Sequence, residues 1–366
     1  MDFIDLKTRH KLISENITNN IQKVMEHGRF ILGPEVSELE QRLSEYVGVK
    51  HCVTVSSGTD SLLIALMALG VGPGDEVITV PYTWISSAEV IALLGAKPVF
   101  VDIRPDNWNM NEQLLEAAVS EKTKAIMPVS IYGQTPDMDS INEIAARYDI
   151  AVIEDAAQSF GATYKGRKSC NLSSIGSTSF FPSKPLGCYG DAGALFTDND
   201  EWAEKFRWIR VHGQERKHHH PILGLNGRMD TIQAAILLAI LDVFPDEVSA
   251  RMKIGDRYST ALTGVEGITC PSVPEGSTSV YAQYTILSEQ REGIQSSLKA
   301  AGIPSVSYYT VPMHLQPVFS DLSYKEGSFP TTENVAKSCL SLPMSPYLKE
   351  EEQSQVIETI LRFSDK

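Results

Sequence analysis

The chain has 366 residues, of which 42% are hydrophobic and 21% are charged, and its formal net charge is −14. This composition is typical of a globular protein long enough for two domains of ordinary size. The acidic balance argues against a nucleic-acid partner, because phosphate backbones are bound by clustered lysine and arginine. No apolar run reaches the roughly 18 residues of a membrane-spanning helix, and the N-terminus lacks a signal-peptide core, so we expect no membrane partner.

The five cysteines are scattered and form no C-x-x-C pair. That pattern favours free thiols in a reducing cytoplasm over a disulfide framework or a zinc site. The run His218-His219-His220 is interpreted as a polar loop, because three consecutive side chains do not converge easily on one metal ion. We expect a cytoplasmic protein that binds no metal.

The first half of the chain alternates between strand and helix patterns. Apolar residues at helical spacing predict a helix over residues 8–27 and another from Pro34, which suits a first helical turn. Strands are then predicted at 52–55, 76–80, 98–101, 124–129 and 151–153, and helices at 59–69, 85–94, 111–119 and 138–148. This alternation predicts an α/β fold with a mostly parallel sheet, whose ligands bind beyond the carboxyl ends of the strands.

The pattern changes near residue 240. Residues 231–243 and 248–262 are predicted as two helices, with a break or kink at Pro245 between domains. Alternating residues at 280–286 then precede helices near 293–301 and 350–363. We therefore predict a large α/β domain over residues 1–243 and a smaller C-terminal α+β domain over residues 244–366.

Lys184 lies between a strand end that carries hydroxyl groups and a glycine-spaced loop. A lysine can form a Schiff base when burial or a nearby cation lowers its pKa, although most lysines are solvated surface charges. Asp155 ends an apolar strand, at the edge where an α/β sheet presents catalytic groups. Capping of a helix is the alternative interpretation of Asp155.

Ser57-Gly58-Thr59 follows the first strand and opens a helix, which predicts an anion site, although capping alone would explain Thr59. Trp84 follows the second strand and can either stack on a flat ligand or fill a core. Asn226-Gly227-Arg228-Met229 is a turn-like run before an apolar helix.

In this order, these motifs resemble the DegT/DnrJ/EryC1/StrS family of nucleotide-sugar aminotransferases, which depend on pyridoxal 5'-phosphate (PLP). The resemblance covers nearly the whole chain and is carried by residues 28–35, 57–59, 73–77, 154–159, 178–193, 226–230 and 233–235. It implies the PLP-dependent transferase fold type I, like aspartate aminotransferase, with a mostly parallel seven-stranded sheet in the large domain. It also implies a homodimer with shared active sites.

The resemblance implies a role for each matching residue. Lys184 would hold PLP as a Schiff base and move the proton, with pyridoxamine phosphate (PMP) as intermediate, and Asp155 would pair with the ring nitrogen. The remaining cofactor contacts would come from Gln158 at the ring hydroxyl, Trp84 on the ring face, Gly58, Thr59 and Ser179 at the phosphate, and Asn226 of the neighbouring subunit. The implied substrate contacts are Tyr308 and Tyr309, and Arg228 would contact either the substrate or the neighbouring subunit.

Residues 170–173, 180–190 and 280–285 are similar to the branch that aminates C3 of UDP-2-acetamido-2-deoxy-3-oxo-D-glucuronate, with L-glutamate as donor, for bacterial surface polysaccharide such as O-antigen. Tyr308 stands where that branch has histidine, whereas Tyr309 is retained. Because tyrosine is not cationic near neutral pH, a C4 aminotransferase acting on a UDP- or dTDP-4-keto-6-deoxy sugar is the alternative. Whether His314 compensates is open.

Two other classes share this fold. One is the PLP- or PMP-dependent sugar dehydratase, which typically has histidine in place of the lysine, so Lys184 argues against it. The other is a catalytically silent regulator or assembly protein, which the retention of every cofactor position disfavours.

Overall fold

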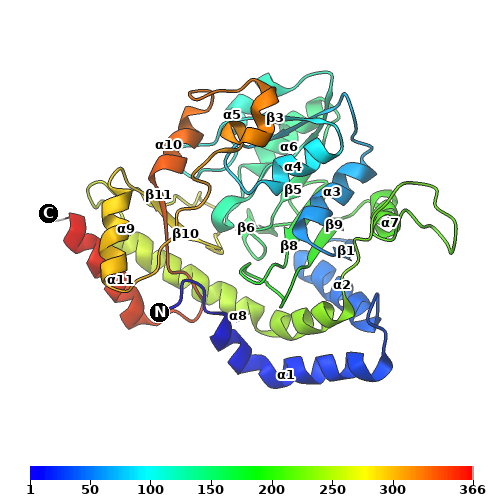
Figure 1. The fold of residues 1–366 in the computed structure, drawn as a ribbon, viewed down its shortest axis with the longest axis horizontal. Coiled ribbons are helices and arrows are strands. Elements are labelled where there is room, and N and C mark those ends of the chain that lie inside the picture. Colours follow the sequence, from blue (N-terminus) through cyan, green and yellow to red (C-terminus); the bar gives the residue numbers. More distant parts are fainter. Residues whose placement is uncertain (365–366) are drawn as a thin grey trace.

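The computed structural model describes residues 1–364, and within them a seven-stranded sheet forms the centre of the molecule (Figure 1). Its order is β1-β9-β8-β5-β4-β2-β3, and only β9 runs antiparallel to its neighbours. The strands are β1 (His51–Val55), β2 (Glu76–Thr79), β3 (Lys97–Phe100), β4 (Thr123–Ile126), β5 (Ala151–Asp155), β8 (Ile175–Ser179) and β9 (Gly193–Thr197). The predicted α/β class and mostly parallel sheet are confirmed.

Helices cover both faces of this sheet. Side chains alternate between the faces along each strand, so Cys52 and Phe196 join one core while their neighbours Val53 and Leu195 join another. The helices of the large unit are α1 (Leu6–His27), α2 (Pro34–Val47), α3 (Gly58–Ala68), α4 (Ser86–Leu93), α5 (Glu112–Leu115), α6 (Met138–Arg147), α7 (Asp200–Ile209) and α8 (Thr231–Leu262). The short strands β6 (Thr163–Tyr164) and β7 (Arg167–Lys168) form a separate hairpin.

Helix α8 runs without interruption through Pro245. The prediction of two helices separated there is therefore wrong. A proline inside a helix lacks the N–H of one backbone hydrogen bond, but long-range packing can offset this cost. Here α8 packs along α1 and α2, and buries Phe244 and Glu247 on either side of the proline.

The C-terminal part contains a two-stranded antiparallel sheet of β10 (Tyr284–Leu287) and β11 (Cys339–Leu342), with helices α9 (Arg291–Ala300), α10 (Pro330–Ser338) and α11 (Glu350–Ser364). Several contacts cross the predicted boundary at 243/244. Asp102, beyond β3, accepts hydrogen bonds from the backbone N–H groups of Thr331 and Thr332 at 3.0 Å each, at the start of α10. The division into two domains stays a prediction, since α8 belongs to both. Within the described part of the chain, no helix combines the length and apolarity needed to cross a bilayer.

Candidate active site

The carboxyl ends of the parallel strands place Asp155 at the centre of one sheet edge. Asp155 is the last residue of β5 and is 5% exposed. Its Oδ2 accepts a hydrogen bond from Ser87 Oγ at 2.8 Å, and its Oδ1 accepts one from the backbone N–H of Ala157 at 3.2 Å. Burial raises the pKa of Asp155, while these hydrogen bonds and the charge of Lys184 oppose that shift.

Lys184 lies in the tight loop that connects β8 to β9. The loop is closed by a hydrogen bond from Cys188 N–H to the Phe180 carbonyl at 2.8 Å, and the N–H of Lys184 donates to the Phe181 carbonyl at 2.8 Å. Gly187 is required for this fold of the backbone, because a Cβ there would lie 2.5 Å from the Pro182 carbonyl oxygen. These bonds therefore fix the backbone of the loop on which Lys184 lies.

The electrostatic environment of Lys184 favours its neutral form. Burial lowers the pKa of the lysine, and the charge of Asp155 opposes that shift. Within residues 1–364, no carboxylate lies within 4.0 Å of the amine, the limit of an ion pair. Lys184 is partly buried, and a desolvated amine without a direct counter-ion is the form of lysine that acts as a nucleophile.

The start of α3 meets the end of β8. A Cβ on Gly58 would lie 2.5 Å from the Cβ of Ser179, so only glycine allows this close approach. Ser57 caps α3 by accepting the N–H of Asp60 at 3.0 Å, and Thr59 Oγ1 is hydrogen-bonded to Ser86 Oγ at 2.8 Å. The first N–H groups of a helix lack intrahelical acceptors and attract anions. This junction fits a phosphate group.

Gln158 is held by hydrogen bonds to two tyrosines, of which the sequence analysis had named only Tyr309. Its Oε1 accepts the backbone N–H of Tyr132 at 2.9 Å, and its Nε2 donates to the hydroxyl of Tyr309 at 3.0 Å. Both tyrosines have left-handed backbones, with φ of 57° and 59°, a strained conformation that often marks functional sites. Tyr309 therefore lies with Gln158 and Asp155. Nothing in the sequence around Tyr132 had marked Tyr132 as a site residue.

The other aromatic candidates differ in their surroundings. Trp84 is 62% exposed, so it does not fill a core and its ring face is free for a flat ligand. Tyr308 packs against Phe3 of the N-terminal segment, with 6.3 Å between ring centroids. His314 is buried and its Nε2 is hydrogen-bonded to Glu333 at 3.0 Å. His314 thus pairs with a residue of α10.

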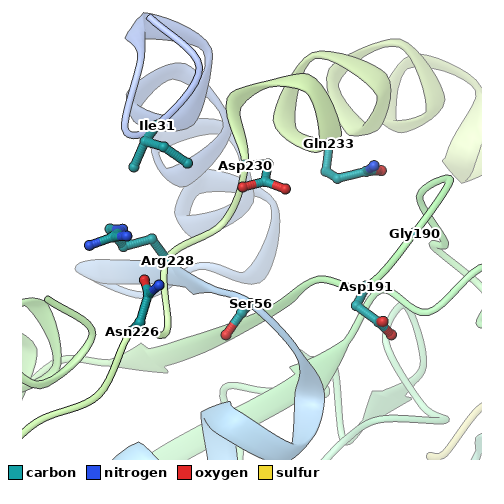
Figure 2. Close-up of a pocket in the computed structure, with 8 residues that line it drawn as sticks. All are labelled: Ile31, Ser56, Gly190, Asp191, Asn226, Arg228, Asp230 and Gln233. Atoms are coloured by element: carbon teal, nitrogen blue, oxygen red, sulfur yellow. The ribbon is translucent and has the colours of Figure 1, made fainter. Parts of the chain in front are cut away.

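Asn226 and Arg228 line a separate cavity of about 440 Å³ (Figure 2). The cavity is also lined by Ile31, Ser56, Gly190, Asp191, Asp230 and Gln233. The run of residues 226–228 is tied to the end of β1, because Ser56 N–H donates to the Gly227 carbonyl at 2.9 Å. Arg228 Nε is buried without a hydrogen-bond partner in the described chain. Lys184 is not among the residues that line this cavity.

Two further features bear on ligands. Ser87, which sequence reasoning missed, contacts Asp155 directly, and its position in α4 gave no signal before the fold was known. No group of three potential metal ligands occurs among residues 1–364. In the loop after α7, His219 instead pairs with Glu215 at 2.8 Å.

The site fits PLP. It combines the close Gly58–Ser179 junction, the Lys184 amine without an ion pair in the described chain and the buried Asp155.

Comparison with known proteins agrees with this geometry. The model of the DegT/DnrJ/EryC1/StrS aminotransferase family matches residues 11–361, and the chain belongs to this family. A Pseudomonas aeruginosa protein named UDP-2-acetamido-2-deoxy-3-oxo-D-glucuronate aminotransferase is 53% identical over 348 residues, covering 95% of this chain and 96% of that protein. A Geobacillus stearothermophilus protein named pleiotropic regulatory protein is 46% identical, covering 98% of this chain and 97% of that protein.

The fold is shared over its full length with a solved relative. The structure of S. venezuelae DesV in complex with a ketimine intermediate has a TM-score of 0.98 and 36% identity, and covers 100% of this chain and 98% of that chain. The expected fold type I is confirmed by this match and by the family.

Proposed function

We propose that this protein is a PLP-dependent aminotransferase that moves an amino group from L-glutamate to C3 of UDP-2-acetamido-2-deoxy-3-oxo-D-glucuronate. The observation that carries the proposal is that a partly buried Lys184, which makes no ion pair within the described residues, lies close enough to the buried Asp155 at the carboxyl edge of the sheet to feel its charge. Membership of the aminotransferase family and the name of the Pseudomonas aeruginosa relative support the reaction and the sugar.

The residues present would divide the work as follows. Gly58, Thr59 and Ser179 would hold the cofactor phosphate at the start of α3, and Trp84 would cover the ring. Asp155, fixed by Ser87, would face the ring nitrogen. When bound, PLP supplies an electron sink for the bonds at the amino-bearing carbon.

The chain's own acid–base group is Lys184. Because burial lowers the pKa of Lys184 and so favours its neutral amine, Nζ can accept a proton and return it to a neighbouring carbon. Gln158 would hold its place at the ring hydroxyl through its bonds to Tyr132 and Tyr309. Tyr308, Tyr309 and Arg228 are proposed to contact the sugar.

The active unit is proposed to be a homodimer in which Asn226 reaches the cofactor phosphate of the partner subunit. Support comes from the cavity around Asn226 and from exposed apolar side chains beside it, since Phe30 and Ile31 are each 45% exposed. The five cysteines are free thiols, which supports a cytoplasmic location. A role in O-antigen synthesis follows from the proposed product.

The name of the Geobacillus stearothermophilus relative favours a regulatory protein as the second candidate function.

One assay separates the aminotransferase from the regulatory protein. The enzyme is given PLP, L-glutamate and either the UDP-3-oxo-glucuronate or a dTDP-4-keto-6-deoxy sugar, and 2-oxoglutarate is measured. We expect more than one equivalent of 2-oxoglutarate per active site only with the first sugar, with NMR placing the amine at C3. Turnover of only the 4-keto sugar would overturn the C3 assignment, and no turnover with either would favour the regulator.

A further inference from the structure

A buried ion pair lies behind the lysine loop. Arg9 of α1 and Glu247 of α8 are each 3% exposed. Arg9 donates from Nε to Glu247 Oε1 at 2.8 Å and from Nη2 to Oε2 at 2.7 Å. Two parallel hydrogen bonds of this kind fix the plane of a guanidinium group as well as its position.

The same guanidinium holds the backbone beside Lys184. Arg9 Nη2 donates a further hydrogen bond to the carbonyl oxygen of Pro185 at 3.0 Å. Proline has no N–H, so this carbonyl is its only polar backbone group. On the N-terminal side, the backbone N–H of Lys184 itself donates to the Phe181 carbonyl. Lys184 is therefore held on both sides, once from within its loop and once from α1.

The cluster also reaches the C-terminal part of the chain. The hydroxyl of Tyr347 donates to Glu247 Oε1. Burial and the hydrogen bond to Glu247 raise the pKa of Tyr347, so the hydroxyl keeps its proton and remains a donor. Arg251, one turn beyond Glu247, is 1% exposed and donates to the Tyr281 carbonyl at 3.3 Å. The Glu247 carboxylate thus accepts hydrogen bonds from one buried guanidinium group, that of Arg9, and from one hydroxyl, that of Tyr347.

We propose that Arg9 is a positioning residue for Lys184, which sets the direction of the lysine through the Pro185 carbonyl. The proposal rests on the proposed role of Lys184. A buried ion pair contributes little net stability compared with well-packed apolar side chains. The hydrogen bond from Arg9 to the Pro185 carbonyl gives the ion pair a second role, which is to hold the backbone next to Lys184. Through Tyr347, the position of the C-terminal part is transmitted to the same loop.

The test compares the wild type with Arg9→Lys, Tyr347→Phe and the control Arg42→Lys. Lysine retains the charge opposite Glu247 but cannot serve two carboxylate oxygens and a carbonyl together. Arg42 is a matched control, because it donates to Asp242 and to the Leu238 carbonyl of α8 but not to the lysine loop. Cofactor-free protein is treated with an amine-acylating reagent at a series of pH values, and labelling of Lys184 is compared with that of the exposed Lys50 by mass spectrometry.

We expect Arg9→Lys to change the relative labelling of Lys184 and its pH midpoint, and to lower kcat about tenfold at unchanged KM for the sugar. Arg42→Lys should match the wild type in both measurements. Wild-type labelling and kcat in Arg9→Lys, or equal changes in both arginine variants, would overturn the proposal. If Arg9→Lys does not fold, the same two measurements are made on Tyr347→Phe. We expect smaller changes in Lys184 labelling and in kcat there, and wild-type values of both would overturn the proposal. Labelling does not require turnover, so it tests the position of Lys184 even if the protein does not catalyse the proposed reaction. Failure of the proposed function would appear only in kcat.

Discussion

Ser87 Oγ donates a hydrogen bond to Asp155 Oδ2 at 2.8 Å, and so joins the first turn of α4 to the end of β5. This bond lowers the pKa of a carboxyl group that burial raises. Loss of a hydrogen bond to a charged group is worth about 1.5–3 kcal/mol. We therefore expect Ser87→Ala to raise the pKa of Asp155 further.

The expected consequence is a fall in kcat of about tenfold near neutral pH, with the acid limb of the kcat–pH profile moved to higher pH. Steady-state kinetics over a range of pH checks this prediction. Ser296→Ala is the control, because Ser296 bonds only to the Glu292 carbonyl on exposed α9. An unchanged acid limb in Ser87→Ala would show that the hydrogen bond does not tune Asp155.

The Gly58–Ser179 contact predicts a strong effect of one methyl group. In Gly58→Ala the new Cβ would meet the Ser179 Cβ at 2.5 Å and push α3 away from β8. Overpacking of this kind costs about 1–3 kcal/mol. We expect weaker PLP binding, measured by titrating the cofactor-free protein. Gly72→Ala is the matched control, since a Cβ there meets nothing within 4 Å. Equal PLP affinity in both variants would contradict the phosphate site.

Glu154 gives the protein a specific dependence of stability on pH. It points away from Asp155 to the other face of β5, where Ser169 and the N–H of Cys170 donate to it. Burial raises the pKa of Glu154 from its ordinary 4.5 to about 7. Between these values the folded state holds a proton that the unfolded state has lost, so this residue makes stability fall as pH rises through that window.

The measurement is the free energy of unfolding of the wild type minus that of Glu154→Gln, from denaturant titrations. We expect this difference to decrease by about 3 kcal/mol between the two pKa values and then to level off. Glu143→Gln, at an exposed side chain, should show no such trend. A difference that rises with pH would mean that the native carboxyl group is ionised.

Tyr309→Phe tests whether the hydroxyl of Tyr309 holds Gln158 in the position that the reaction needs. The substitution leaves Gln158 Nε2 without its acceptor at 3.0 Å, at a cost of about 1–3 kcal/mol for a buried polar group. We expect kcat/KM for the sugar to fall about tenfold or more. Tyr148→Phe, which removes a hydrogen bond to Glu116 on the surface, is the control. If kcat/KM is the same in both variants, Tyr309 does not hold Gln158 for catalysis.

Local patterns in the sequence predicted most of the fold. The strand ends that carry Asp155 and Ser179, and the glycine at the start of α3, were readable because period and turn chemistry are local. Pro245 was misread, because packing of α8 against α1 and α2 overrides the local preference of proline. Ser87, Tyr132 and Arg9 were missed for a related reason. Their partners lie 68, 26 and 238 residues away in the chain, so only the fold reveals them.

The central claim is that Lys184 is the residue through which glutamate loses its amino group. The most direct measurement is the amount of 2-oxoglutarate formed when the purified protein, supplied with PLP, is mixed with L-glutamate in the absence of a sugar. We predict about one equivalent per active site for the wild type, and a rate lower by about three orders of magnitude or more for Lys184→Ala. Equal formation of 2-oxoglutarate by both proteins would contradict the claim.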